Sequence, residues 1–172
     1  MCLRSLGFII VSVSLILNSA AHAAQANVPS AASWAVYKDA QGTLVEYPRD
    51  VFSVAQEQGG QEPGRVFSSE DERARLHVYS LPNPKALSPA AFVRANFPVR
   101  RSTLTYDRVS RNFFALSTRR DGMIVYLRCN FSARRGSNLH CVDIRYPASE
   151  KSDWDGIVTR ISRSLRPLAA TR

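Results

Sequence analysis

The pattern of hydrophobic and polar residues predicts that most of this chain forms β-strands, most clearly in residues 121–146. There, two long β-rich runs flank a short turn that ends at Gly136. A three-residue hairpin loop needs a left-handed residue, usually glycine, at that position. In the register that this loop sets, Cys129 faces Cys141 and both side chains point to one face of the sheet. We therefore predict a β-hairpin closed by a disulfide between these two cysteines.

Shorter β-rich segments precede this hairpin along the chain. Residues 34–37 and 43–47 predict a first hairpin, and residues 65–68 and 73–81 predict a second one. In the last of these segments, aliphatic residues alternate with Arg, His and Tyr, which is the period of a half-buried strand. Two further strands are predicted within residues 103–118.

Two segments have the features of helices instead. A first helix is predicted to begin at Ser88 and Pro89, because a capping hydroxyl followed by proline favours a helix N-terminus. A second helix is predicted over residues 149–165, with Ser149 or Ser152 as its N-cap. Its hydrophobic residues recur at helical spacing on one stripe, namely Trp154, Ile157, Val158, Ile161 and Leu165. This stripe must pack on a sheet, and the last three strands are the nearest candidate.

The order of these elements predicts an α+β domain. Hairpin connections make consecutive strands antiparallel, which excludes a parallel sheet for most of the chain. In the strand predicted at residues 123–131, hydrophobic residues occupy both faces, so both faces of the sheet need a cover. We therefore expect an antiparallel β-sheet flanked by helices, that is, an α/β/α sandwich.

The segment 1–23 has the features of a secretory signal peptide. A single positive charge at Arg4 precedes an apolar core too short to span a bilayer comfortably, and small residues mark a cleavage site near Ala23-Ala24. The alternative is an uncleaved membrane anchor. We expect a periplasmic or secreted protein with no transmembrane span in the mature chain.

Beyond the signal peptide, the sequence predicts one domain with two short extensions. Residues 24–33 are small and polar without a hydrophobic period, which is typical of a flexible leader. Residues 34–167 then form a single α+β domain, of a length that one hydrophobic core can stabilise. Residues 168–172 are left as a C-terminal tail.

Export also determines the state of the cysteines. Cleavage removes Cys2 and leaves Cys129 and Cys141 in an oxidising setting, which favours a disulfide. Closing a loop of this size stabilises a domain by about 3 kcal/mol on the chain-entropy model. The alternative, a redox-active pair, lacks the Cys-x-x-Cys spacing that lowers a thiol pKa. We therefore expect a structural disulfide.

The chain is strongly basic, with a formal net charge of +9 that becomes +8 when Arg4 leaves with the signal peptide. A basic exported protein meets anionic envelope surfaces or acidic proteins, although its charge can also serve solubility alone. Arginine forks suit phosphate and carboxylate groups. The candidate anion or partner contacts are three arginine doublets, Arg100-Arg101, Arg119-Arg120 and Arg134-Arg135.

Geometry separates two of these doublets. The second and third flank the predicted strand at residues 123–131, which places them roughly 30 Å apart at the usual strand rise. They therefore do not form one compact site. The doublet at residues 100–101 can join either of them.

Candidate catalytic chemistry in the mature chain is limited to His77 and His140. Neither has a second ligand at metal-site spacing or an assured carboxylate partner. The chain also lacks a Gly-x-Ser-x-Gly elbow and a glycine motif that would cradle a phosphate. We therefore predict no catalytic residues, no metal site and no cofactor. The aromatic residues are better used in the core than in nucleic-acid stacking, so no nucleic acid is expected.

Several spaced motifs resemble small exported bacterial proteins with a PsbP-like fold. In chain order they are Trp34-x-x-Tyr37, Tyr47-Pro48 with Val51-Phe52, Phe67-Ser68 with Glu70-Asp71, Arg73-Ala74-x-Leu76, Arg128-Cys129, Cys141, Tyr146-Pro147, and Ile157-Val158 through Ser164-Leu165-Arg166-Pro167. One departure is Glu72, which stands where a glycine is expected in the turn after Asp71. The resemblance implies an antiparallel sheet between helices, and accessory or assembly roles around protein complexes rather than catalysis. It supplies no catalytic residues.

These observations favour an exported, non-enzymatic binding or accessory domain. Its partner is unknown, and the basic charge suggests an anionic envelope component or a protein complex. The alternative function is a hydrolase-type enzyme whose site is assembled around His77 or His140 from residues distant in the sequence.

Overall fold

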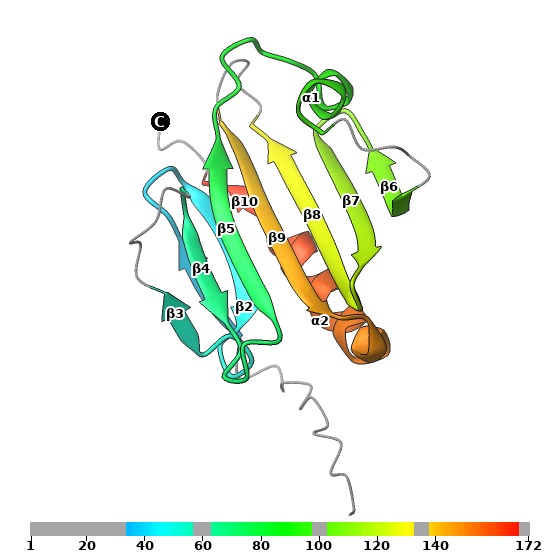
Figure 1. The fold of residues 1–172 in the computed structure, drawn as a ribbon. Coiled ribbons are helices and arrows are strands. Elements are labelled where there is room, and N and C mark those ends of the chain that lie inside the picture. The colour runs from blue at the N-terminus through cyan, green and yellow to red at the C-terminus, as the bar shows by residue number, and fades with distance from the viewer. Residues whose placement is uncertain (1–33, 57–62, 98–102, 133–137, 169–172) are drawn as a thin grey trace, which may run out of the picture.

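The structure, a computed structural model, describes residues 34–56, 63–97, 103–132 and 138–168. These residues form two antiparallel sheets and two α-helices (Figure 1). The larger sheet has seven strands, in spatial order β3 (Val54–Gln56), β4 (Arg65–Ser68), β5 (Arg75–Leu81), β9 (Leu139–Pro147), β8 (Met123–Phe131), β7 (Phe113–Arg120) and β6 (Leu104–Val109). The smaller sheet has three, β1 (Trp34–Lys38), β2 (Thr43–Pro48) and β10 (Arg166–Pro167).

The helices are α1 (Pro89–Asn96) and α2 (Lys151–Ser164), the latter preceded by a 3₁₀ turn, η3 (Ala148–Glu150). Within the described ranges, neither helix has the length and apolar character needed to cross a membrane. The predicted signal peptide at residues 1–23, the leader at 24–33 and residues 169–172 of the predicted tail lie outside the described residues.

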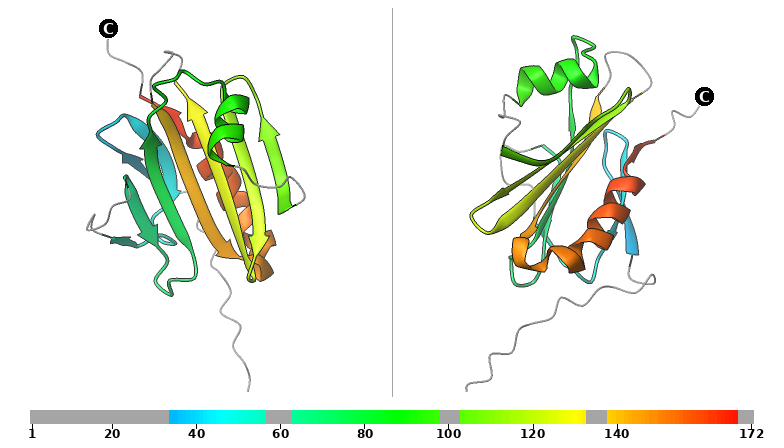
Figure 2. Two further views of the ribbon diagram at one scale, coloured as in Figure 1. Left: turned by 45° about the horizontal axis from the view of Figure 1, so that its top comes forward. Right: turned by 90° about the vertical axis from the view of Figure 1, so that its right-hand side faces the viewer.

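The large sheet lies between two layers, as Figure 2 shows in its right-hand view. Helix α1 covers one face, whereas α2 and the small sheet lie side by side on the other. This arrangement confirms the predicted α+β class and the antiparallel sheet flanked by helices. The sequence did not predict that the first hairpin would form a separate sheet in the layer of α2.

The last strand explains how this small sheet is held. After α2 the backbone turns extended at Leu165, and Arg166 and Pro167 pair with Leu44 and Thr43 of β2. Pro167, which follows the end of α2, therefore belongs to a short strand at the sheet edge, where its missing N–H is tolerated.

The predicted central hairpin is present with the predicted register. Cys129 of β8 faces Cys141 of β9, and Phe131 faces Leu139. The two cysteines form a disulfide, with their Cα atoms 4.1 Å apart. The predicted loop at residues 134–136 lies outside the described residues, so the conformation of Gly136 stays a prediction.

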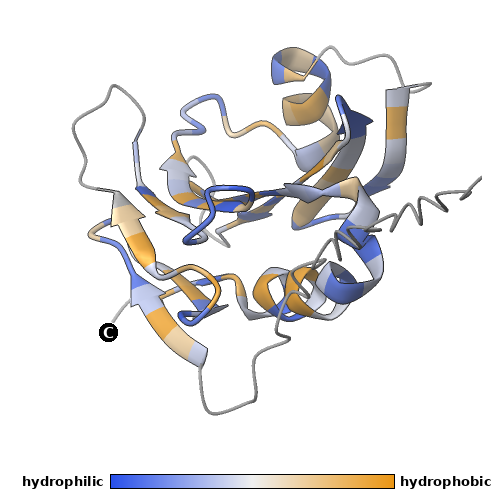
Figure 3. Cartoon of the chain, turned by 60° about the horizontal axis from the view of Figure 1, so that its bottom comes forward, coloured by the Kyte–Doolittle hydropathy of each residue, from blue (hydrophilic) through white to orange (hydrophobic). Residues whose placement is uncertain are grey.

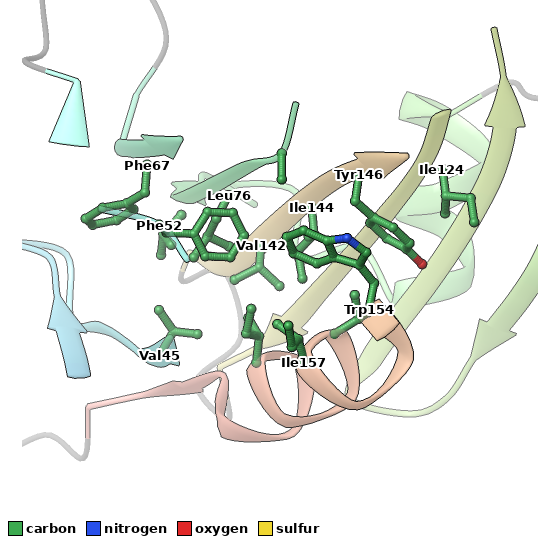
Figure 4. Close-up of a cluster of buried hydrophobic side chains, with 14 of the residues drawn as sticks. Val45, Phe52, Phe67, Leu76, Ile124, Val142, Ile144, Tyr146, Trp154 and Ile157 are labelled. Carbon is green, nitrogen blue, oxygen red and sulfur yellow. The ribbon is translucent and has the colours of Figure 1, made fainter. Parts of the chain in front are cut away.

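The core between α2 and the sheets is built on the predicted helical stripe. Trp154, Ile157 and Ile161 are almost fully buried in a cluster with Val45 of β2 and Ile144 of β9 (Figure 4). Figure 3 shows hydrophobic residues along α2 and on strands that flank it. The helix therefore packs on the small sheet as well as on the large one, because its stripe faces the space between them.

The N-terminus of α2 differs from its prediction. The residue at the N-cap is Glu150, without a side-chain capping bond, so the prediction of Ser149 or Ser152 in this role is wrong. The 3₁₀ turn η3 leads directly into the helix instead. The carboxylate of Glu150 instead accepts hydrogen bonds from Trp154 Nε1 at 3.2 Å and from Arg73 Nη1 at 2.6 Å.

The opposite face of the large sheet packs beneath α1. The helix begins as predicted, since Ser88 Oγ accepts a hydrogen bond from the Ala91 N–H at 3.3 Å. Phe92 of α1 stacks on Phe114 of β7 in a cluster that also contains the disulfide. The disulfide therefore lies on the face of the hairpin opposite to α2.

The turn after Asp71, where the resemblance leads us to expect a glycine, has Glu72 in a left-handed conformation. Glu72 has φ of 56°, in the left-handed region where glycine is usually preferred. Its N–H donates to the carbonyl oxygen of Ser69 at 3.0 Å. Glu72 is therefore a non-glycine residue in a left-handed turn conformation.

Candidate functional site

Helix α2 leaves part of its face of the large sheet uncovered. A cleft of about 640 Å³ lies between α2 and the strands β6, β7 and β8, and this volume is within the range of small-molecule sites. Its charged lining residues come from β6, β8 and α2, and they are Arg108, Arg128, Lys151, Asp155 and Arg163. Among the described residues, the cleft therefore brings together four cations and one carboxylate.

The carboxylate neutralises only one of these cations. Lys151 Nζ lies 2.6 Å from Asp155 Oδ2, one helical turn away on α2. Among the residues that the structure describes, Arg108, Arg128 and Arg163 form no ion pair with a carboxylate. A guanidinium keeps its charge at all physiological pH values, so the cleft has an excess of positive charge.

Arg128 is the most firmly positioned of the three arginines. Its guanidinium carbon lies 4.1 Å from the ring centroid of Phe113. Its Nε donates to Asn130 Oδ1 at 2.9 Å, and its Nη1 donates to Ser162 Oγ at 3.3 Å. A guanidinium has five N–H donors, so these two hydrogen bonds leave donors for a ligand in the cleft.

Strand and helix periodicity explain why these side chains converge. Ile124, Tyr126 and Arg128 alternate along β8 and therefore point to the same face of the sheet. On α2, Lys151, Asp155, Val158 and Ser162 recur at spacings of three and four residues, which places them along one side of the helix. The cleft is formed where these two rows face each other.

Two tyrosines of the cleft, Tyr126 and Tyr146, differ in what surrounds their hydroxyl groups. The hydroxyl of Tyr126 lies 2.8 Å from Ser162 Oγ. Burial, with smaller contributions from the charge of Asp155 and from Tyr126, raises the pKa of Tyr146 to about 12. A phenol with such a pKa stays protonated under physiological conditions, so Tyr146 does not act as a base.

The predicted arginine doublets do not line this cleft where the structure describes them. Arg119 and Arg120 are exposed at the end of β7, and Arg120 Nε lies 3.1 Å from Asp121 Oδ2. Arg100-Arg101 and Arg134-Arg135 lie outside the described residues and stay predictions.

The arginines that do converge were missed by the sequence analysis because each stands alone in the chain. One signal was present. Arg128 occupies the middle of a long hydrophobic strand, on the same face as Ile124 and Tyr126, where an arginine needs a polar partner or an opening to solvent.

His140 is buried in a polar network between the two sheets. Its Nδ1 lies 2.9 Å from Thr43 Oγ1, and its Nε2 lies 3.1 Å from Ser132 Oγ. Asp39, also buried, accepts a hydrogen bond from the Thr43 N–H at 2.6 Å. Burial lowers the pKa of His140, and the nearby charge of Asp39 opposes this shift. With both ring nitrogens bonded and 4% of the residue exposed, His140 serves to join β9 to β2.

His77 lies on the other face of the large sheet, in a more open position. Its Nε2 lies 2.8 Å from the carbonyl oxygen of Pro63, and its ring stacks on Tyr79 with centroids 4.4 Å apart. Asp143 and His77 line the same cavity of about 220 Å³. A histidine and a carboxylate therefore share a small surface cavity, which the sequence did not predict.

The structure brings together no group of three or more His, Cys, Asp or Glu side chains suited to a metal ion, within the ranges that it describes. Protein zinc sites usually combine three or four such ligands. The donors of the cleft are instead mainly guanidinium, ammonium and phenol groups, which suit anions.

Comparison with known proteins identifies the fold. No family model and no curated protein matches the sequence. Among solved structures, the chain is similar to the solution structure of cyanobacterial PsbP (CyanoP) from Synechocystis sp. PCC 6803, with a TM-score of 0.60 and 13% sequence identity. The match covers 80% of this chain and 94% of that chain. The protein therefore has a PsbP-like fold.

Proposed function

We propose that the protein is an exported, non-enzymatic binding domain that holds an anionic group in the cleft between α2 and strands β6–β8. The observation that carries this proposal is the convergence of three arginines without a carboxylate partner in the described part of the chain, Arg108, Arg128 and Arg163. The group would belong to an anionic envelope component or to an acidic protein of a complex. The predicted signal peptide and the disulfide support export.

The protonation states in the cleft favour binding over acid–base chemistry. Arginines do not release a proton at physiological pH, and the raised pKa of Tyr146 keeps its phenol neutral. Such groups donate hydrogen bonds to an oxyanion, and charge-assisted hydrogen bonds of this kind are among the stronger ones. The cleft is therefore better suited to recognition than to proton transfer.

A pair of variants with equal charge tests the site. Arg128→Gln removes the arginine that Phe113, Asn130 and Ser162 hold in place, whereas Arg120→Gln removes an exposed arginine outside the cleft. The affinity for inorganic phosphate is measured by calorimetric titration of the purified protein at low ionic strength. R128Q should bind phosphate about tenfold or more weakly than the wild type. R120Q should bind phosphate within about twofold of the wild type.

Equal weakening in the two variants would mean that phosphate responds only to net charge, and the proposed site would then be wrong. Circular dichroism and urea unfolding of both variants would show whether the fold is retained. Arg128 also contacts Ser162, so this check is needed for R128Q in particular.

The alternative function is a hydrolase-type enzyme, and the cavity shared by His77 and Asp143 is the observation that favours it. Assays with p-nitrophenyl esters and p-nitrophenyl phosphate would detect such an activity. Turnover by the wild type that disappears in His77→Ala would support the enzyme and count against the binding proposal.

A further inference from the structure

The floor of the cleft is formed by residues that pair across three adjacent strands. Tyr106 of β6 pairs with Ser117 of β7, which pairs with Tyr126 of β8. All three residues line the cleft. Because neighbouring strands lie about 4.8 Å apart, two aromatic side chains flank a small one at roughly twice that spacing. This row forms a slot with a phenol on each side and a serine at its base.

The next row on the same face carries charge instead of aromatic rings. Arg108 of β6 pairs with Ala115 of β7, which pairs with Arg128 of β8. Both arginines line the cleft, and both guanidinium groups lie over the ring of Phe113, at 5.6 Å and 4.1 Å from its centroid. The two rows are two residues apart on each strand, which corresponds to about 7 Å. A pair of arginines therefore adjoins the pair of tyrosines.

Helix α2 forms the other wall and leaves this end of the cleft positive. At the N-terminal end of the helix, Lys151 and Asp155 neutralise each other. Near its C-terminal end, Ser162 contacts both Tyr126 and Arg128, and the adjacent Arg163 also lines the cleft. The excess positive charge is therefore concentrated beside the arginine row, with no such excess at the Lys151 end.

From this arrangement we infer that the cleft takes a small aromatic oxyanion, an aryl carboxylate or aryl phosphate. The acidic group lies between Arg108 and Arg128, and the ring lies in the slot between Tyr106 and Tyr126. This inference rests on the proposed function, since it specifies the ligand of the same site. Aromatic rings prefer offset-stacked or edge-to-face neighbours with centroids 4.5–7 Å apart, and a slot with a ring on each side provides two such contacts. The guanidinium groups of Arg108 and Arg128 donate charge-assisted hydrogen bonds to the planar carboxylate or to the phosphate.

Calorimetric titration of the purified protein with phenyl phosphate, benzoate, cyclohexanecarboxylate and inorganic phosphate tests the ligand class. Phenyl phosphate should bind about tenfold or more tightly than inorganic phosphate, and benzoate should bind more tightly than cyclohexanecarboxylate, which has the same charge but no aromatic ring. Similar affinities for the aromatic and saturated carboxylates would overturn the aromatic slot.

Two exposed residues of the edge strand β6 provide a matched pair of variants. Tyr106 is 44% exposed and lines the cleft, whereas Val109 is 39% exposed and does not. Tyr106→Ala should weaken phenyl phosphate binding by about 3- to 10-fold and leave inorganic phosphate within about twofold. Val109→Ala should change neither affinity. A Y106A protein with unchanged phenyl phosphate binding would contradict the inference.

The results distinguish failure of this inference from failure of the proposed function. If both phosphates bind with equal affinity, and R128Q but not R120Q or Y106A weakens them, the cleft binds anions without an aromatic slot. If no phosphate or carboxylate binds, or if R128Q and R120Q have equal effects, the proposed function fails as well.

Discussion

The two faces of the large sheet are covered in different ways. Beneath α1, the side chains of Phe92, Phe114 and Leu139 pack closely around the disulfide. Beneath α2, a buried hydrophobic core lies near β9 and the small sheet, but over β6–β8 it gives way to the basic cleft. One face is therefore mainly structural, and the other combines a core with a candidate site.

The difference follows from the number of elements that each helix must cover. The apolar stripe of α2 packs against Val45 of the small sheet and Ile144 of the large sheet, so little of it remains for β6–β8. The side of α2 that faces these strands carries Lys151, Asp155 and Ser162. A ligand site can thus arise where a covering layer ends, because polar side chains are tolerated there.

The largest expected effect concerns the packed face. Phe114 is fully buried and contacts the rings of Phe92 and Phe131. Phe114→Ala should therefore lower the free energy of unfolding by about 3–5 kcal/mol. Tyr126→Phe, in the cleft, removes only the hydrogen bond to Ser162 and should cost about 0.5–1.5 kcal/mol. Urea unfolding measures both, and similar losses would contradict the proposed difference between the faces.

A smaller effect is expected from the disulfide. Replacing Cys129 and Cys141 together with alanine should lower the free energy of unfolding by about 3 kcal/mol, because the unfolded chain gains freedom. Since the bond lies on the α1 face, phosphate affinity of the folded variant should stay within about twofold of the wild type. A folded variant that no longer binds phosphate would show that the two faces are coupled.

The smallest change in the free energy of unfolding is expected from a change in pH. The charge of Asp39 partly offsets the lowering of the His140 pKa that burial causes. Burial lowers the pKa of His140 in the folded protein, whereas the unfolded imidazole titrates near 6.5. The unfolded state thus binds the proton more readily, and stability should fall as pH drops below about 6.5, levelling off below the lowered pKa. Urea unfolding at pH 7.5 and 5.5 should show a smaller pH dependence for His140→Asn. Equal pH dependence in both proteins would exclude His140 as its source.

Local patterns were sufficient to predict much of the packed face. The parity of Cys129 and Cys141 predicted the register of β8 and β9, which the structure confirms. Ser88 and Pro89 predicted the start of α1. The N-cap of α2 was predicted wrongly, because the serines on either side of Glu150 suggested caps while a 3₁₀ turn leads into the helix there.

The candidate site was not predictable in the same way. Adjacent arginines are conspicuous in a sequence, yet the described doublet, Arg119-Arg120, lies outside the cleft. Arg108, Arg128 and Arg163 belong to three elements, and no short-range pattern links them. Their convergence depends on the register of β6 with β7 and on the position of α2 over the sheet.

Short-range sequence patterns were enough to specify the antiparallel hairpins, the pairing of the two cysteines and the buried stripe of α2. These features depend on residue periods of two and 3.6 and on turn chemistry, which act over a few residues. The assembly of β1, β2 and β10 into a second sheet beside α2 depends instead on the folded arrangement of the whole domain. Because the small sheet lies there, the apolar stripe of α2 packs on it and on β9. The cleft over β6–β8 is therefore left open. It results from packing between distant segments, which local periodicity does not specify.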